Sequence, residues 1–167
     1  MLQNGTVISG TLIEKPHSFS TACNIATQII AQVASNQYGG QSVDMSHLGK
    51  YLRRSREKFR KHIFYECAGQ VDEATLERLV NDRVRDELKS GVQTIQYQIN
   101  TLMTTNGQSP FVTLFLNLRE DDPYLEENAL IVEEVLRQRL EGIKNEAGVY
   151  ITPAFPKLIY TLEEDNI

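Results

Sequence analysis

Residues Gly91–Leu118 have the sequence GVQTIQYQINTLMTTNGQSPFVTLFLNL, and this stretch is the most informative part of the chain for predicting the fold. The apolar residues Ile95, Leu102 and Met103 recur at helical spacing. Asn106-Gly107 then breaks the helix, because both residues tolerate a positive φ. The apolar run Phe111–Leu116 that follows is rich in β-branched and aromatic residues, and it predicts a strand buried on both faces, as in a parallel α/β sheet or barrel.

The connection between this helix and this strand, residues 104–109, consists of short polar residues. Polar side chains beside a parallel strand are a common ligand-facing arrangement. By pattern alone, however, an ordinary connecting loop is the simpler interpretation, so both alternatives stay open at this point.

Composition places the chain among ordinary water-exposed globular proteins. It has 167 residues, 41% of them apolar and 23% charged, and a net charge of −5. The length suits one domain with a real core. We expect no membrane association and a cytoplasmic location, because no apolar run reaches the ~20 residues that span a bilayer and no signal peptide opens the chain. Cys23 and Cys67 lack a CxxC context, which is typical of reduced structural thiols.

Helical and extended patterns alternate along the chain. Residues 1–16 are predicted to be extended, with turns at Asn4-Gly5 and Ser9-Gly10. We expect helices from Ser18 to about 36, from Ser46 to about 67, from 72 or 75 to 104 with a kink at Ser90-Gly91, and from 122 to about 148. Strands at 111–118 and 156–162 flank the last helix, so this part predicts a right-handed, parallel βαβ unit.

The first two helices have contrasting faces. The first is apolar on one side and polar but uncharged on the other, where Thr21, Gln28, Gln32 and Ser35 lie, and this favours an interface over bulk solvent. The second lies in a basic region, because residues 50–62 hold seven Lys or Arg against one Glu. Its basic stripe consists of Lys50, Arg54, Lys58 and Lys61. Taken alone, such a stripe is most simply a solvated face.

Three segments resemble one known family. The whole segment Gly91–Leu118 is similar to part of this family, AQVASNQYGGQ (31–41) to its helix ending in a Gln-Tyr-Gly-Gly turn, and ITPAFPKLIY (151–160) to its Thr-Pro-x-Phe-Pro-Lys strand entry. With MLQNG and GTLIEKPHSF at the start, the resemblance covers essentially the whole chain. The family is the large catalytic subunit of the anaerobic, class III ribonucleoside-triphosphate reductases.

The resemblance implies a fold and a function. It predicts an α/β fold: a helix-rich slice of the glycyl-radical-enzyme barrel, with parallel strands and long dimer-interface helices. Residues 1–104 would supply the effector and dimer-interface helices and residues 105–167 the βαβ portion of the barrel. The complete enzyme would reduce ribonucleoside triphosphates to deoxyribonucleoside triphosphates by glycyl and thiyl radical chemistry, and we expect this chain, as an internal fragment, to be inactive alone.

The same resemblance implies cofactors and partners. In the family, the glycyl radical, a four-cysteine zinc site and both catalytic cysteines lie outside the segments found here. We therefore expect none of these groups in this chain, and we expect the chain to bind no cofactor. The complete enzyme is expected to use formate or another reductant and to bind deoxynucleotide and ATP effectors. Its expected partners are a second copy of the subunit and an activating enzyme with an iron–sulfur cluster and S-adenosylmethionine.

Carried across motif by motif, the family's deoxynucleotide effector site falls on five residues: Glu14, His17, Gln28, Lys58 and Gln98. A triphosphate needs cations and hydrogen-bond donors, and a base needs amides or carboxylates on its polar edge. His17 stands where relatives can have lysine and Gln98 where they can have glutamate, and both differences bear on which deoxynucleotide this site would prefer. Asn106 and Gln108 are expected beside the substrate.

The sequence offers no residue for a catalytic role and no metal site. Cys23 and Cys67 match neither catalytic cysteine segment of the family, and His17, His47 and His62 are scattered without ligand spacing. Two rival functions remain: a stand-alone nucleotide-binding dimerisation module, and nucleic-acid binding by the basic stripe. The latter conflicts with the net negative charge and with the lack of aromatic residues between the basic ones. We therefore expect no nucleic-acid partner.

Overall fold

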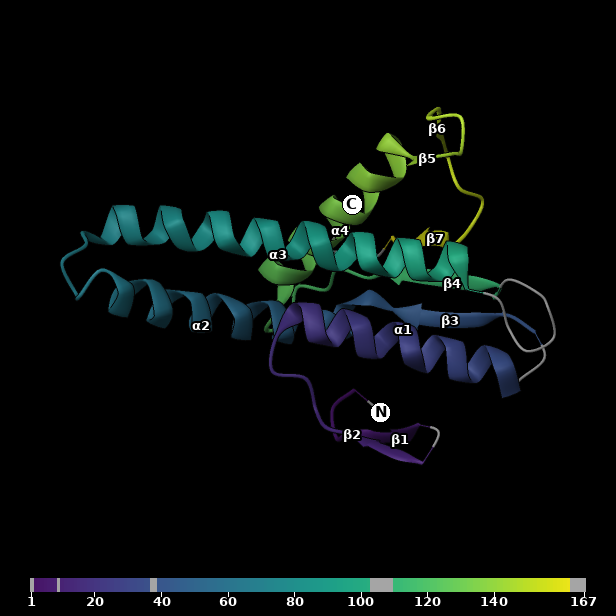
Figure 1. The fold of residues 1–167 in the computed structure, drawn as a ribbon, viewed down its shortest axis with the longest axis horizontal. Coiled ribbons are helices and arrows are strands. Elements are labelled where there is room, and N and C mark those ends of the chain that lie inside the picture. The colour runs from purple at the N-terminus through teal and green to yellow at the C-terminus, as the bar shows by residue number, and fades with distance from the viewer. Residues whose placement is uncertain (1, 9, 37–38, 103–109, 163–167) are drawn as a thin grey trace.

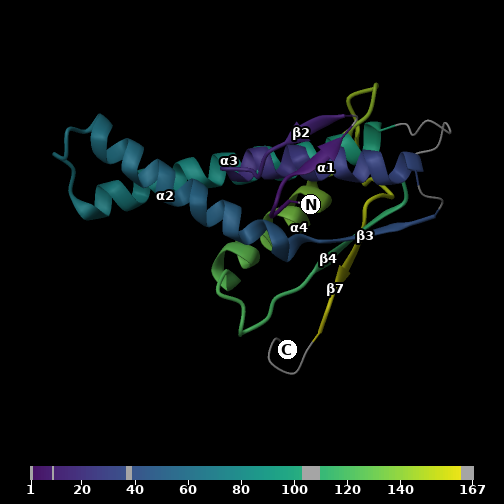
Figure 2. The same cartoon turned by 90° about the horizontal axis from the view of Figure 1, so that it is seen from below.

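A computed structural model describes residues 2–8, 10–36, 39–102 and 110–162, and it shows helices packed on one side of a small parallel sheet (Figure 1). Three long helices lie together, and a fourth packs against them: α1 (Phe19–Asn36), α2 (Gly49–Glu66), α3 (Glu73–Thr101) and α4 (Leu125–Glu141). The sheet has the order β3-β4-β7, with strands β3 (Gln41–Asp44), β4 (Val112–Leu116) and β7 (Lys157–Tyr160). Figure 2 shows these strands below α1 and α3, with α4 beside them.

Two short antiparallel hairpins complete the described structure. One, β1 (Thr6–Ile8) and β2 (Thr11–Ile13), lies near the N-terminus, as the extended segment with turns predicted. The other, β5 (Ile143–Lys144) and β6 (Tyr150–Ile151), follows α4. Our prediction ran α4 to about residue 148 and was therefore too long. Gly142 ends the helix with φ 78°, a conformation that glycine adopts without the steric cost of a side chain.

The second predicted helix begins differently from our expectation. The carboxylate of Asp44, not the side chain of Ser46, caps it by accepting the Ser46 backbone N–H at 2.9 Å. One 3₁₀ turn, Met45–Leu48, follows, and α2 starts only at Gly49. A carboxylate at this position satisfies a backbone donor that no earlier turn can reach.

Helices α2 and α3 form an antiparallel hairpin that extends beyond the sheet in both views (Figures 1 and 2). Asp72 caps α3 by accepting the N–H of Thr75, as predicted, and the helix runs unbroken to Thr101. The prediction of a kink at Ser90-Gly91 is wrong. Gly91 is buried where α1 crosses α3, and it serves close packing between the two helices rather than a bend.

The predicted parallel βαβ unit is confirmed, since β4 pairs with β7 in parallel across α4. A third parallel strand, β3, pairs with the other edge of β4, and this strand was not predicted from the sequence. The expectation that β4 is buried on both faces is only half right. Val112, Leu114 and Leu116 lie in the helix-covered core, whereas the alternate residues are half-buried.

The fold is therefore a mixed helix and sheet structure with a parallel sheet, in agreement with the α/β class expected. The barrel and the dimer interface stay predictions. The core runs as one cluster from the apolar face of α1 through α2 and α3 to α4 and the covered face of β4.

Candidate functional site

The five residues predicted to form an effector site are all exposed on the helical side of the molecule. Glu14 and His17 lie between β2 and α1, whereas the other three lie on successive helices: Gln28 on α1, Lys58 on α2 and Gln98 on α3. None of the hydrogen bonds or ion pairs between described residues joins two of the five. Whether they form one site therefore depends on how the helices are placed.

The segment before α1 is attached to α2 one turn before Lys58. Arg54 donates to the backbone carbonyl of Pro16 at 3.4 Å, and the N–H of Phe19 donates to the buried hydroxyl of Ser55 at 2.9 Å. Four residues of α-helix rise about 6 Å, so His17 lies close to the part of α2 that carries Lys58. These two contacts thus attach the segment that carries His17 to α2 about one turn from Lys58.

Gln28 and Gln98 lie further along the helices. The start of α1 packs beside the middle of α3, where the N–H of Ser20 donates to Glu87 at 3.1 Å and Gly91 lies against Phe19. Gln28 is nine residues beyond Phe19, which is about 14 Å along the helix. The predicted site is therefore a strip along α1 rather than a compact pocket within one copy of the chain.

The structure divides the cations of α2 into three groups. Arg53, Arg56 and Arg60 face the neighbouring helices: Arg56 donates to Asn81 at 2.6 Å, and Arg60 pairs with Glu73 and Glu77. These roles were not visible in the sequence, because acidic partners on a different helix leave no local pattern.

The other cations of α2 lie on its outer side. Lys50 and Arg54 lie over the buried ring of Tyr51, at 4.9 and 5.5 Å from its centroid. Partial burial, with a smaller effect of the neighbouring Arg54 charge, lowers the pKa of Lys50. Lys58 and Lys61 are exposed, and no ion pair between described residues involves either of them. They are the members of the predicted stripe best placed to meet an anion from solvent.

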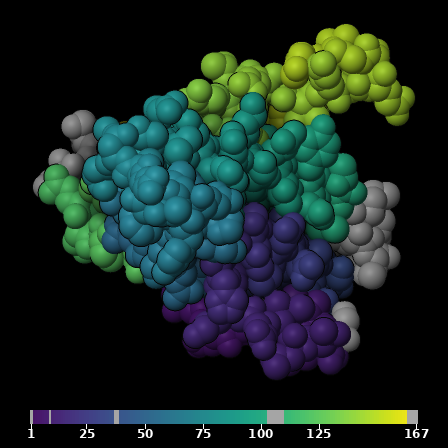
Figure 3. Space-filling view, turned by 60° about the vertical axis from the view of Figure 1, so that its left-hand side comes forward, coloured from purple at the N-terminus to yellow at the C-terminus, as the bar shows by residue number. Residues whose placement is uncertain are grey.

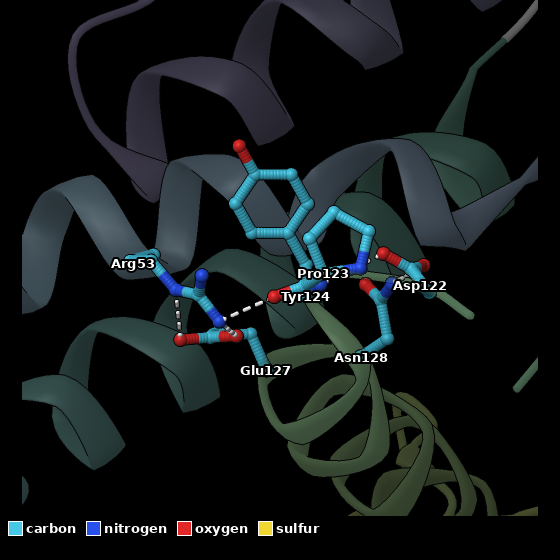
Figure 4. Close-up of polar contacts among 6 residues, drawn as sticks. All are labelled: Arg53, Asp122, Pro123, Tyr124, Glu127 and Asn128. Carbon is cyan, nitrogen blue, oxygen red and sulfur yellow. Dashed lines mark hydrogen bonds and ion pairs between the residues drawn. The ribbon is translucent and has the colours of Figure 1, made fainter. Parts of the chain in front are cut away.

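An ion pair between half-buried Arg53 and buried Glu127 holds the start of α4 against α2 (Figure 4). Arg53 donates to both carboxylate oxygens of Glu127, at 2.8 and 2.7 Å, and to the carbonyl of Pro123 at 2.6 Å. Its guanidinium lies 4.7 Å from the ring centroid of Tyr124. The hydrogen bond to Glu127 raises the pKa of Arg53. This arrangement positions the loop that joins β4 to α4.

A polar network joins the carboxyl ends of the three parallel strands. Asn117 donates to Asp44 at 2.8 Å, and the hydroxyl of Thr161 donates to Asn117 at 2.6 Å. These residues line a cavity of about 620 Å³ together with His47 and Arg119. Carboxyl ends of parallel strands are a frequent place for ligands in α/β folds. Polar residues directly after β4 could have indicated Asn117, but Asp44 escaped notice because β3 was not predicted.

The two cysteines have different surroundings. Cys23 is fully buried between α1 and α3, and burial, with a smaller contribution from the Glu87 charge, raises its pKa far above the usual value for a thiol. Cys67 is half-buried at the C-terminal end of α2. Asn106 and Gln108 lie outside the described residues.

The described residues show two further features that bear on function. No three His, Cys, Asp or Glu side chains among them gather as a group that could hold a metal ion. None of the described helices combines the length and the apolar character needed to cross a membrane.

Comparison with known proteins places the whole chain in one group. Residues 1–167 match the family model described as anaerobic ribonucleoside-triphosphate reductase. Proteins of that name from Haemophilus influenzae and Escherichia coli are 35% and 36% identical to 98% of this chain, and one from Enterobacteria phage T4 is 35% identical over the same share. The chain spans 22% of the length of the two bacterial relatives and 26% of the phage protein.

Proposed function

This chain belongs to the anaerobic ribonucleoside-triphosphate reductase family, and we propose that it is part of an enzyme that reduces ribonucleoside triphosphates to deoxyribonucleoside triphosphates. The observation that carries the proposal is the family match over all 167 residues. Because the chain spans about a quarter or less of its relatives, the radical chemistry itself is assigned to other parts of the protein. There we propose a glycyl radical, a zinc site, a reductant such as formate and action by an iron–sulfur activating enzyme, all in the cytoplasm.

The role proposed for this segment is regulation of substrate choice by a deoxynucleoside triphosphate. Lys58 is an exposed cation, and His17 lies beside the same part of α2, which together suit a polyphosphate. Further along α1, Gln28 supplies an exposed amide for a base or ribose. The proposal uses only side chains of this chain, and it assigns them binding and orientation rather than any chemical step.

A strip of this shape suits an interface between two copies. The exposed polar side of α1 carries Thr21, Gln28 and Gln32, with no charged residue among them. Uncharged polar surfaces lose less on desolvation than charged ones, so such a face can be covered by a second subunit. We propose a homodimer in which the two α1 helices meet and complete the effector sites.

The connection between α3 and β4 joins the helices of the proposed effector site to the sheet. It starts from the helix that carries Gln98 and ends at the central strand of the sheet. Asn106 and Gln108 belong to this connection, and we propose that they lie beside the substrate. An effector on the helices would then act on the substrate through a short covalent path.

A comparison of two lysines tests the effector site. In the complete protein, Lys58→Ala should weaken binding of deoxynucleoside triphosphates roughly ten- to a hundredfold, because losing a charge-assisted phosphate contact costs about 1.5–3 kcal/mol. Lys61→Ala is the matched control, since it removes another exposed lysine three residues away. It should leave binding nearly unchanged. The measurement is an effector titration at one salt concentration, with the choice of substrate as second readout.

Two outcomes would change the proposal. Equal losses from both substitutions would reduce Lys58 to part of a diffuse basic field. Effector binding by a complete protein that reduces no ribonucleoside triphosphate under anaerobic, activated conditions would favour the rival function, a nucleotide-binding dimerisation module without reductase activity.

A further inference from the structure

A second pocket lies on the other side of α3 from Gln98. The C-terminal end of α4 and the β5–β6 hairpin rise beside the C-terminal half of α3 (Figure 1) and project from the body of the molecule (Figure 3). The pocket between these elements has a volume of about 300 Å³, at the lower end of the range for small-ligand sites. Gln96 lines it, and because each helical residue turns the direction by about 100°, Gln98 points away from it.

The pocket contains a buried hydrogen-bond donor that no described residue satisfies. Gln96 is only 5% exposed, and its side-chain Nε2 has no acceptor among the described residues. A buried amide without a partner costs free energy, and native proteins rarely tolerate one unless a water molecule or a ligand completes it. Gln138, also buried on the pocket wall, shows the contrast. Its Nε2 donates to the Lys89 carbonyl at 2.9 Å and to Glu134 at 2.6 Å.

The remaining walls supply aromatic surface and positive charge. Tyr97 and Tyr150 line the pocket with half-exposed or exposed rings, and the ammonium of Lys144 lies 5.0 Å from the centroid of the Tyr150 ring. The charged residues that line the pocket are Lys89, Lys144 and Glu141, so the lining carries one net positive charge that suits an anionic group. Aromatic rings beside amide side chains suit a flat heterocycle with polar edges, because rings stack on its face while amides bind its edge.

We propose that this pocket binds a nucleoside monophosphate. The base lies against Tyr97 and Tyr150, an acceptor on its edge receives the free N–H of Gln96, and the phosphate meets Lys89 and Lys144. The inference stands on the pocket alone, and it holds whether or not the strip along α1 binds an effector.

The test is a calorimetric titration of the complete protein with the four common ribonucleoside 5′-monophosphates, with inorganic phosphate as the fragment control. Gln96→Met keeps the length of the side chain and removes the donor. It should weaken binding of the preferred monophosphate about three- to tenfold. Lys144→Ala, at an exposed position, should weaken it by about tenfold and serves if the Gln96 variant does not fold. Gln70→Met is the matched control, because it makes the same replacement at an exposed position outside the pocket, and it should leave this binding unchanged.

Thermal unfolding without ligand adds an independent readout. Gln96→Met should raise the melting temperature, because an apolar side chain replaces an unpaired buried donor. Weaker ligand binding in a more stable protein is therefore the expected result. The proposal is overturned if no monophosphate binds the wild-type protein at millimolar concentration. It is also overturned if binding survives both Gln96→Met and Lys144→Ala, or if Gln70→Met weakens binding as much as Gln96→Met.

Discussion

Replacing Gly91 with alanine should have two opposite effects on the stability of the fold, because Gly91 lies where α1 packs against α3. On an exposed helix, Gly→Ala stabilises by about 1 kcal/mol, because alanine restricts the unfolded backbone. At this position the new Cβ would lie 2.6 Å from Cε1 and 2.8 Å from Cδ1 of Phe19, and 3.0 Å from the sulfur of Cys23. Both neighbours are fully buried, so neither can move into solvent.

The clash should win. Carbon atoms pack best at about 3.5–4.0 Å, so a contact at 2.6 Å forces the helices apart or the Phe19 ring out of its rotamer. Overpacking of this kind costs roughly 1–3 kcal/mol. Because the Phe19 ring is rigid, we expect the cost at Gly91 to lie at the upper end of this range. After subtraction of the helix-propensity gain, we expect Gly91→Ala to lower the free energy of unfolding by about 2 kcal/mol. That corresponds to a melting temperature lower by roughly 4–8 °C for a chain of this size.

The assay is thermal denaturation followed by helical circular dichroism. Ser90→Ala, at the exposed neighbouring position, is the control and should be neutral or slightly stabilising. Phe19→Leu provides the rescue: in that background the added methyl has room, so Gly91→Ala should cost at least 1 kcal/mol less. Stabilisation by Gly91→Ala in the wild-type background would refute the reasoning, because it would mean that α1 does not approach α3 this closely.

Two further predictions follow from buried groups. Arg53→Met should destabilise the fold by roughly 1–3 kcal/mol in denaturant titrations, because it leaves the carboxylate of Glu127 buried and without its partner. The double variant Arg53→Met with Glu127→Met should recover most of that loss. No recovery in the double variant would show that the arginine acts through packing on Tyr124 instead. Because burial raises the pKa of Cys23, its thiol should react with a disulfide reagent at pH 8 only after denaturation, while half-buried Cys67 reacts in the native protein. Equal native reactivity of the two thiols would contradict the buried position of Cys23.

Periodicity and capping chemistry were sufficient to locate the four helices and the strands β4 and β7. Ser18 and Asp72 lie at or next to the starts of α1 and α3, and the apolar run at 111–116 marks β4, because these signals act within one or two turns of the chain. The order strand, helix, strand was enough to predict that β4 and β7 are parallel. The motifs spread along the chain were likewise enough to indicate the family that the comparison then showed.

Contacts between distant residues were beyond the reach of the sequence. A glycine in a helix predicts a weak point, and only the presence of Phe19 against Gly91 turns it into a packing site. The same limit applies to β3, whose four residues carry no strong strand pattern and are held by pairing with β4.

The candidate sites show this division most clearly. The sequence, through its family resemblance, determined which residue types are available for an effector: Glu14, His17, Gln28, Lys58 and Gln98. Only the tertiary structure decided that Arg54 holds the segment before α1 beside the turn preceding Lys58, and that the Nε2 of Gln96 is buried without an acceptor among the described residues. The physical reason is that charge and polarity belong to a residue, whereas burial and hydrogen-bond partners depend on what folds against it.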